Sequence, residues 1–246
     1  MKKFFSNFLL ILSICGVCIS GYKLYSIFTE YHSGTQTYEE LEKQIKIKTE
    51  EKIEEKKEEE ITLDVNFENL KKINSSCIGW IYIQNTRINY PIVQSTDNDY
   101  CLHHTFDGTK NFTGSIFVSN QNDEFNDQNT IIYGHNMQNG TMFTDIKKYK
   151  EQDFLDNNPY IYIAKPNGTT EKYKIFAAYI TEDCSDAYMI QFATDTFLNE
   201  IENMRNRSIV KTSDFTISNK DKIITLSTCT SRTELERFVV HAVKVN

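Results

Sequence analysis

The chain has 246 residues, and 27 Lys and Arg against 34 Asp and Glu give it a formal net charge of −7. This length allows one sizeable domain with extensions, and the acidic balance argues against a nucleic-acid-binding surface. Glycine (9) and proline (3) are sparse, while aromatic and β-branched residues are common from Ile78 onward. This composition favours a mainly β domain with a packed core.

The N-terminus starts with two lysines, at positions 2 and 3, followed by an apolar run over residues 4–22. The run is close to the roughly 20 residues that a helix needs to cross a bilayer. The lysines before it predict a cytoplasmic N-terminus and an extracytoplasmic body. A cleaved signal peptide is the alternative, but residues 19–22 match a cleavage site poorly. We therefore expect residues 1–25 to be an uncleaved membrane anchor.

Residues 38–60 are almost wholly Glu, Lys, Gln, Thr and Ile. High helix propensity and opposite charges near i,i+4 spacing predict a helix here. Leu41, Ile45 and Ile53 are too sparse for a coiled-coil seam. We expect residues 26–60 to form a solvated helical stalk and residues 61–246 to form the domain.

Short, alternating segments separated by polar turns follow, a pattern typical of a closed barrel or a sandwich. A short helix, capped by Asn66, is predicted for residues 67–73. Asn167-Gly168 predicts a hairpin turn, and helical spacing of apolar residues predicts a helix over residues 195–207. The predicted strands are residues 78–83, 87–93, 114–118, 130–133, 160–164, 171–180, 223–226 and 238–245.

Three side chains at predicted strand ends suggest chemistry. Cys229 ends the apolar run 223–229, His135 follows the strand at 130–133, and Arg237 opens the last strand. A cysteine thiolate attacks carbonyl groups at neutral pH, a histidine transfers protons, and an arginine stabilises developing negative charge. These are the parts of a cysteine acyl-transfer enzyme. The alternative for Cys229 is a buried thiol that packs as a small hydrophobe.

Several motifs in order along the chain resemble a class B sortase, over about residues 67–245. The resemblance implies a mainly β fold, namely a closed eight-stranded sortase-type barrel with N-terminal helices and a helix inserted between strands six and seven. The predicted helix at 195–207 matches that insertion. The motifs are Gly79-Trp80-Ile81, Asn89-Tyr90-Pro91-Ile92-Val93-Gln94, Gly114-Ser115-Ile116-Phe117, Tyr133-Gly134-His135-Asn136-Met137 and Thr225-Leu226-Ser227-Thr228-Cys229.

The resemblance also implies an activity: a membrane-anchored cysteine transpeptidase on the outer face of a Gram-positive membrane. Such an enzyme cuts the C-terminal sorting signal of a surface protein after its threonine. It holds the product as a thioacyl-enzyme, here on Cys229, and passes it to a peptidoglycan amine. The alternatives are a pilin-polymerising sortase, another cell-wall cysteine hydrolase, and a non-catalytic binding module on a membrane stalk.

By motif match, Cys229 is the nucleophile, His135 the proton-transfer group and Arg237 the cation on the oxyanion side. Arg237 is favoured over a nearer arginine because a residue on a strand is held more firmly than one in a loop. The rivals are His103, His104 and His241 for the histidine and Arg232 for the cation.

Four residues are candidates for substrate binding. Asn98, Leu102 and Ser227 match positions that line the sorting-signal groove of class B enzymes, and Tyr188 is expected to add an aromatic wall. For Asn98, an ordinary turn or helix cap is the alternative. Because no carboxylate cluster or calcium-type loop is present in the sequence, we expect no metal, and the resemblance implies no cofactor.

We assign no chemical role to the other five cysteines. Cys15 and Cys18 fall in the apolar N-terminal run and lack partner ligands, so we assign them no metal or redox function. Cys77, Cys101 and Cys184 are widely separated. We expect all three to be free, with a disulfide among them as the alternative.

Overall fold

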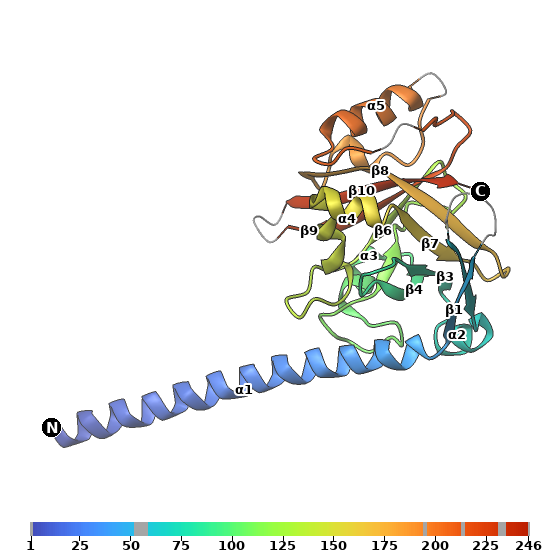
Figure 1. The fold of residues 1–246 in the computed structure, drawn as a ribbon. Coiled ribbons are helices and arrows are strands. Elements are labelled where there is room, and N and C mark those ends of the chain that lie inside the picture. The colour runs from blue at the N-terminus through green and yellow to red at the C-terminus, as the bar shows by residue number, and fades with distance from the viewer. Residues whose placement is uncertain (1, 52–58, 194–195, 213–214, 231–234, 246) are drawn as a thin grey trace.

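The computed structural model describes residues 2–51, 59–193, 196–212, 215–230 and 235–245. Its body is a closed barrel with the strand order β10-β8-β7-β3-β4-β5-β6-β9, from which one long helix projects (Figure 1). The predicted mainly β fold with a closed eight-stranded barrel is confirmed. The barrel strands are β3 (Cys77–Tyr82), β4 (Asn89–Gln94), β5 (Ile116–Val118), β6 (Asn129–Tyr133), β7 (Tyr160–Ala164), β8 (Thr170–Glu182), β9 (Ile223–Cys229) and β10 (Glu236–Val245).

Helices flank the barrel at several points. The α5 helix comes between β8 and β9, the sixth and seventh barrel strands, as the sequence predicts. The cap of α2 is also as predicted, because the Asn66 side chain accepts a hydrogen bond from the Asn69 amide at 3.1 Å. The helices are α1 (Lys2–Glu42), α2 (Phe67–Ile73), α3 (Asn98–His103), α4 (Gln152–Asn157) and α5 (Phe197–Arg207), with 3-10 helices η1 (Phe143–Lys150) and η2 (Asp186–Tyr188).

Two apolar clusters hold the fold together. The larger fills the barrel and includes the fully buried Trp80, whose indole N–H donates to Asn89 Oδ1 at 2.8 Å. The smaller lies between α5 and the outer face of β8 and β10, where Phe197 and Ile201 of the helix join Val239. Burial of such side chains stabilises a fold by about 1.5–3 kcal/mol each. The helical spacing of apolar residues in α5 therefore serves packing against the barrel.

The strand directions decide which ends meet. Strands β4 and β5 run parallel, as do β6 and β9, while the other neighbouring pairs are antiparallel. In the β6–β9 pair, Tyr133 lies opposite Ser227. The C-terminal ends of β6 and β9 are consequently at the same rim of the barrel, and the N-terminal end of β10 joins them there.

The predicted hairpin between β7 and β8 is confirmed. These strands pair in antiparallel register, and the Gly168 amide donates to the Lys165 carbonyl at 3.0 Å in the turn between them. Gly168 has a φ of +83°, a left-handed conformation that glycine adopts without steric cost. Asn167 accepts hydrogen bonds from Thr169 in the same turn.

The predicted helical stalk is wrong in part. After α1 ends at Glu42, residues Ile45–Glu51 form β1, which pairs in antiparallel register with β2 (Glu59–Val65). The inward side chains of β2, Ile61 and Leu63, are buried in the main cluster. Pairing and burial on the barrel therefore override the helix propensity of the charged residues. Ile53, which the coiled-coil argument used, lies outside the described residues.

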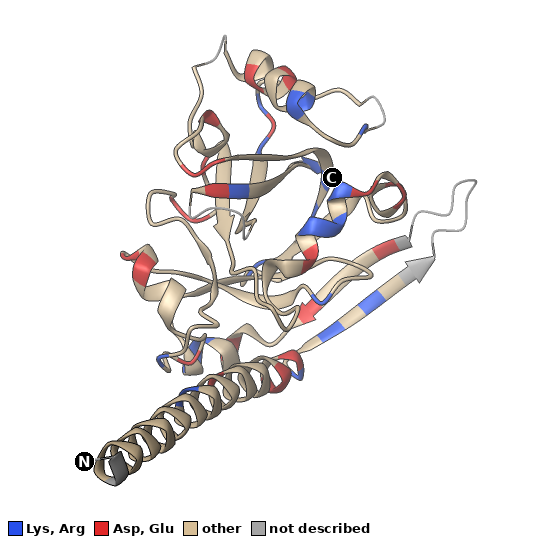
Figure 2. Cartoon of the chain, turned by 90° about the vertical axis from the view of Figure 1, so that its left-hand side faces the viewer, with Lys and Arg blue, Asp and Glu red and all other residues tan. Residues whose placement is uncertain are grey.

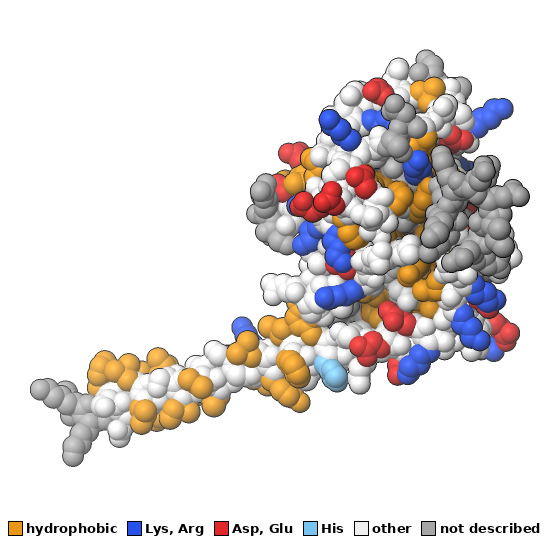
Figure 3. All heavy atoms as spheres, viewed as in Figure 1, with side chains coloured by type: hydrophobic (Ala, Val, Ile, Leu, Met, Phe, Trp, Pro, Cys, Tyr) orange, Lys and Arg blue, Asp and Glu red, His pale blue; other side chains and the backbone are white. Residues whose placement is uncertain are grey.

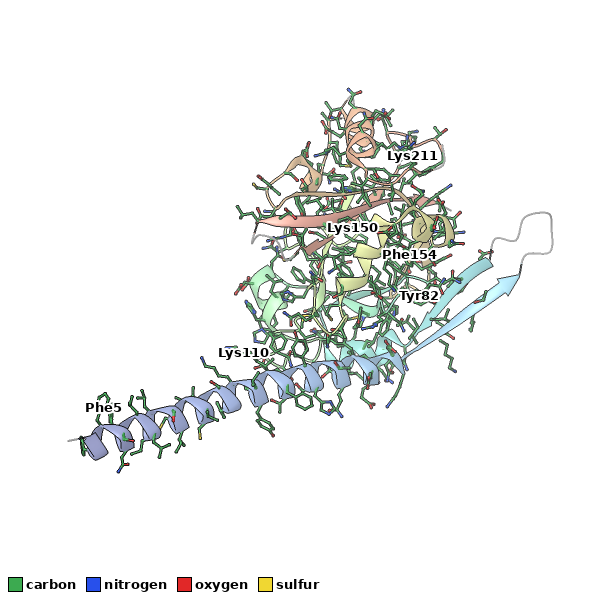
Figure 4. All side chains as sticks on the ribbon, turned by 60° about the vertical axis from the view of Figure 1, so that its left-hand side comes forward. Phe5, Tyr82, Lys110, Lys150, Phe154 and Lys211 are labelled. Atoms are coloured by element: carbon green, nitrogen blue, oxygen red, sulfur yellow. The ribbon has the colours of Figure 1, made fainter. Side chains whose placement is uncertain are left out.

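The α1 helix has two different parts. From residue 4 to residue 28 its large apolar side chains are exposed, as the orange spheres along the helix in Figure 3 show. Figure 2 shows few charged residues along it before the acidic end beside the barrel. Phe5, labelled in Figure 4, points away from the helix into open space. The C-terminal part is not solvated as expected, because Tyr38 and Leu41 are each only 4% exposed and belong to the barrel core.

One described helix, over residues Phe4–Glu42, is long and apolar enough to cross a membrane. A helix rises 1.5 Å per residue, so its apolar part matches a bilayer while its other end packs on the barrel. The single helix α1 therefore carries the apolar run at one end and contacts the barrel at the other.

Candidate active site

The strand topology brings the three chemical candidates to one cleft of about 260 Å³. Cys229 is the last residue of β9, and His135 lies two residues beyond the end of β6, its parallel neighbour. Arg237 lies opposite Cys229 in the antiparallel β9–β10 pair. All three line the cleft, with Cys229 half-buried at its wall. Three residues that are far apart in the sequence therefore line one cleft, while their catalytic roles stay predictions.

The imidazole of His135 is fixed by one hydrogen bond. Its Nε2 lies 2.8 Å from the Leu102 carbonyl oxygen. Because a carbonyl only accepts, Nε2 must carry a hydrogen, and Nδ1 is the nitrogen that gains and loses a proton. Burial lowers the pKa of His135 below its ordinary value, with the Leu102 bond acting in the opposite direction. The resting imidazole is therefore biased toward its neutral form.

The backbone around His135 is held from both sides. The Gly134 amide donates to the Ser227 carbonyl at 3.2 Å, and the Gly134 carbonyl accepts from the Thr228 hydroxyl at 2.7 Å. The Phe143 amide donates to the His135 carbonyl at 2.9 Å. A Cβ at Gly134 would lie 2.5 Å from Ile116 Cδ1 and 2.7 Å from the Phe143 ring. Glycine is required here because only a residue without a Cβ allows this close packing.

The Arg237 guanidinium is held beside the cleft by an acidic partner. Its Nη2 lies 3.3 Å from Asp183 Oδ2, and Asp183 also lines the cleft. The arginine side chain is 21% exposed, so water screens its charge less than on an open surface. A fixed cation next to Cys229 is what an anionic carbonyl oxygen needs as it forms.

The four residues predicted to bind substrate line the same cleft. The Tyr188 hydroxyl and Ser227 Oγ are 2.8 Å apart, and the Tyr188 ring stacks on Tyr133 with 6.1 Å between centroids. Leu102 and Asn98 come from α3. Their role in binding stays a prediction.

Asn98 is not the cap of α3. The preceding residue, Asp97, caps the helix by accepting from the Asp99 amide at 2.9 Å. Asn98 instead accepts from the Asn120 amide at 2.8 Å. Asn98 also lines the cleft, so its side chain lies beside the space that a substrate would occupy.

The rival histidines lie elsewhere. His241 is completely buried, with Nδ1 2.9 Å from the Thr225 hydroxyl and Nε2 3.0 Å from the Tyr179 hydroxyl. Burial, together with the charge of Arg207, lowers the pKa of His241 to about 3. His103 and His104 are not among the residues that line the cleft. The rival cation, Arg232, lies outside the described residues.

Asp183 and Tyr133 are among the cleft residues to which the sequence reasoning gave no role. Asp183, the partner of Arg237, follows β8 with no motif to mark it. Tyr133, which stacks on Tyr188, directly precedes Gly134-His135 and could have been found from that motif. A larger hollow, of about 670 Å³, lies between α1 and the barrel. Its described lining contains neither cysteine nor histidine, so it offers no thiol nucleophile and no imidazole.

All six cysteines are described, and all are free. Cys77 and Cys101 are buried, and burial raises the pKa of each thiol to about 11. Both are therefore protonated at neutral pH and unsuited to nucleophilic attack. Within the described ranges, no three or more His, Cys, Asp and Glu side chains gather as metal ligands.

Comparison with known proteins agrees with this geometry. The family model of the sortase domain matches residues 81–245. Sortase B of Listeria monocytogenes is 42% identical over 172 residues, which cover 68% of each chain. Sortase B of Staphylococcus aureus is 30% identical over 230 residues, which cover 93% of this chain and 91% of the relative. The solved structure of sortase B from B. anthracis has a TM-score of 0.74 and 33% identity, covering 89% of this chain and 100% of that one. The chain therefore belongs to the sortase family of cysteine transpeptidases and, within it, to class B.

Proposed function

We propose that this sortase cuts the C-terminal sorting signal of surface proteins after a threonine and transfers the acyl group to a peptidoglycan amine. The observation that carries the proposal is the cleft where Cys229, His135 and Arg237 meet. In this proposal Cys229 is the nucleophile, His135 the proton-transfer group and Arg237 the cation at the oxyanion. No cofactor takes part in these steps.

In the acylation step, the Cys229 thiol first gives its proton to Nδ1 of His135. The resulting thiolate attacks the carbonyl carbon of the threonine, and the carbon–oxygen double bond opens to an oxyanion. The Arg237 guanidinium stabilises that charge. As the oxyanion collapses, the peptide C–N bond breaks, and Nδ1 of His135 gives its proton to the leaving nitrogen, because an amine anion leaves poorly. The products are a thioester on Cys229 and a peptide with a free amino group.

In the transfer step, the incoming amine attacks the thioester carbonyl carbon. His135, now neutral, takes the proton that the amine loses, and the Cys229 thiolate leaves as the new amide forms. The fixed Nε2–H of His135 supports both steps, since Nδ1 alone exchanges protons while the ring keeps its orientation.

The substrate lies between α3 and the β8–β9 side of the cleft in this proposal. Leu102 contacts apolar parts of the sorting signal, and Asn98 offers an amide to its backbone. Tyr188 and Ser227 form the opposite wall, where their mutual hydrogen bond holds the tyrosine ring. A wall fixed in advance lowers the entropy lost on binding a flexible peptide.

The proposal places the enzyme in the cell membrane of a Gram-positive bacterium. Residues 1–25 form a single-pass anchor with a cytoplasmic N-terminus, and the catalytic domain lies outside. The apolar, exposed N-terminal part of α1 supports this placement. Residues 26–60 connect the anchor to the domain of residues 61–246, with the last turns of α1 packed on the barrel.

A peptide assay with an added amine tests the reaction. Pentapeptide sorting signals with a C-terminal extension are incubated with the full chain in detergent micelles, with and without a glycine-based amine. The proposal expects cleavage after threonine and a new amide product when the amine is present. Hydrolysis alone, unchanged by amine, would favour a cell-wall cysteine hydrolase. Transfer only to a lysine side chain of a protein subunit would favour a pilin-polymerising enzyme.

A further inference from the structure

The C-terminal part of α1 packs on the loop between α3 and β5, residues 104–115. Asn111 of this loop donates through Nδ2 to the Glu30 carbonyl at 2.9 Å. Lys110, labelled in Figure 4, marks the same loop beside the helix. The same loop contains Gly114, which packs against His135. The helix and the active-site histidine therefore contact one shared loop.

Tyr38 makes the deepest contact from α1 into this loop. Its hydroxyl donates to the Gly114 carbonyl at 2.6 Å and accepts from the Phe106 amide at 3.3 Å. Tyr38 is only 4% exposed, so water would not readily replace these bonds. Loss of a hydrogen bond to a buried carbonyl costs about 1–3 kcal/mol. This cost favours the loop position in which Tyr38 donates to Gly114.

Gly114 in turn touches both partners of the bond that fixes the imidazole. It has a φ of +61°. A Cβ there would lie 2.6 Å from the Leu102 carbonyl oxygen and 3.0 Å from His135 Cδ2. The bare backbone of Gly114 therefore packs against the very carbonyl that accepts from Nε2 of His135. Movement of Gly114 changes the space around both groups.

A second tyrosine supports the loop that follows His135. The Tyr90 hydroxyl accepts from the Met142 amide at 3.1 Å, and Met142 forms an isolated bridge with Asn136. The rings of Tyr38 and Tyr90 meet edge to face, with 5.3 Å between centroids. Tyr38 thus contacts Gly114, which packs against the His135 ring, and Tyr90, which holds the loop after His135.

We propose that Tyr38 is a positioning residue for His135: by holding the Gly114 carbonyl, it keeps the Leu102 carbonyl and the imidazole in the arrangement that fixes the Nε2–H tautomer. The inference rests on the proposed role of His135 in proton transfer. It makes the helix that carries the apolar run part of the active-site support. A domain that begins at residue 61 lacks this support.

The test compares Y38F with Y31F in the full chain in detergent micelles. Both substitutions remove one hydroxyl from α1. Tyr31 packs edge to face on Phe112 of the same loop, and no hydrogen bond of its hydroxyl is found among the described residues. Because a small misplacement of a catalytic group can cost up to about 100-fold in rate, Y38F is expected to lower kcat about tenfold or more with KM little changed. Y31F is expected to keep kcat within about twofold of the wild type.

A spectroscopic measurement reads the imidazole without any substrate. The chain has five histidines, so the ¹⁵N signals of His135 can be assigned by comparison with H135Q. The wild type and Y31F are expected to show the Nε2–H tautomer of neutral His135, and Y38F a mixture of the two tautomers. Unchanged tautomer signals and unchanged kcat in Y38F would overturn the inference.

A second variant covers the case in which Y38F does not fold. A Cβ at Gly34 of α1 would lie 2.5 Å from Thr113 Oγ1, so G34L displaces the helix from the loop with the Tyr38 hydroxyl intact. It is expected to give the same mixed tautomers and lower kcat, and wild-type behaviour of G34L would contradict the inference. If the wild type cleaves no sorting signal, the proposed function fails, while the tautomer comparison still decides the role of Tyr38.

Discussion

Arg237 lies directly opposite Cys229 in the β9–β10 ladder, at the rim where both strands meet the end of β6. The ladder fixes the two backbones, and the ion pair with Asp183 fixes the guanidinium. A substrate carbonyl attacked by the Cys229 sulfur would therefore develop its charge next to a cation that is already in place. Little reorganisation is then needed during the reaction.

Loss of this cation should slow the chemical step. R237A is expected to lower kcat on a sorting-signal peptide by about 100- to 1,000-fold, the usual cost of removing an oxyanion donor. The kcat of R237K should lie between those of R237A and the wild type, because an ammonium keeps the charge but not the planar fork of the guanidinium. K244A, which removes a cation from the same strand at its pairing with Glu171, serves as the control. Near-normal kcat in R237A would rule out the assigned role.

The pKa of His135 should lie below the ordinary value of a histidine. Burial disfavours the imidazolium and lowers the pKa of His135 from 6.5. An NMR titration of its ring protons, assigned with H135Q, is expected to give a midpoint below pH 6.5. His103, exposed on α3 beside Asp99, provides a second histidine signal in the same spectra. A midpoint for His135 at or above 6.5 would show that the ring is not desolvated as described.

His241 should make the fold sensitive to acid. Thr225 donates its hydroxyl hydrogen to Asn129, so it must accept from Nδ1–H of His241, and Nε2 accepts from Tyr179. The pKa of His241 is lowered to about 3, so between pH 6.5 and about 3 the unfolded chain binds a proton that the folded chain excludes. The stabilisation is complete above pH 6.5 and is lost as pH falls through this window.

The measurement is the free energy of unfolding of the wild type and H241Q at several pH values between 5 and 7. Below pH 6.5, the wild type should lose stability relative to H241Q by up to about 1.4 kcal/mol per pH unit, the slope for one proton. Carboxylates affect both proteins alike, which is why the difference is informative. A difference that stays constant with pH would mean that His241 is not held neutral.

Membrane attachment should depend on the first part of α1. Deletion of residues 1–25 is expected to move the protein from the carbonate-resistant membrane fraction to the soluble fraction, because it removes the exposed apolar face that stabilises insertion. The matched control replaces those residues with an unrelated single-pass anchor, which should restore the membrane fraction. A protein found soluble with residues 1–25 intact would contradict the anchor.

Much of the barrel and cleft could be predicted because local signals agree with the tertiary structure. The apolar segments at 78–83 and 223–226 become β3 and β9, and the motif around His135 places it at a strand end. Parallel pairing of β6 with β9 then brings His135 to the barrel rim where Cys229 lies. Here each local preference points to the same fold.

The other features depend on contacts that no local pattern encodes. Residues 45–51 have the composition of a helix, yet they form β1 because β2 offers a pairing partner beside the barrel. Asp183 becomes part of the cleft only through its approach to Arg237. The sequence predicts that Tyr38 belongs to a charged, solvated stalk, but the packing of α1 on the barrel buries its ring against Tyr90. Such long-range packing is decided by the whole fold rather than by propensity.

The most direct test of the account is intact-protein mass spectrometry of the enzyme mixed with a sorting-signal peptide in the absence of amine. We predict a mass increase equal to the acyl fragment ending in threonine, located on Cys229 by peptide mapping and lost when a glycine-based amine is added. C229A should show neither the adduct nor peptide cleavage, while C184A, which removes an exposed thiol, should show both. Cleavage that continues in C229A, or an adduct on another residue, would contradict the account.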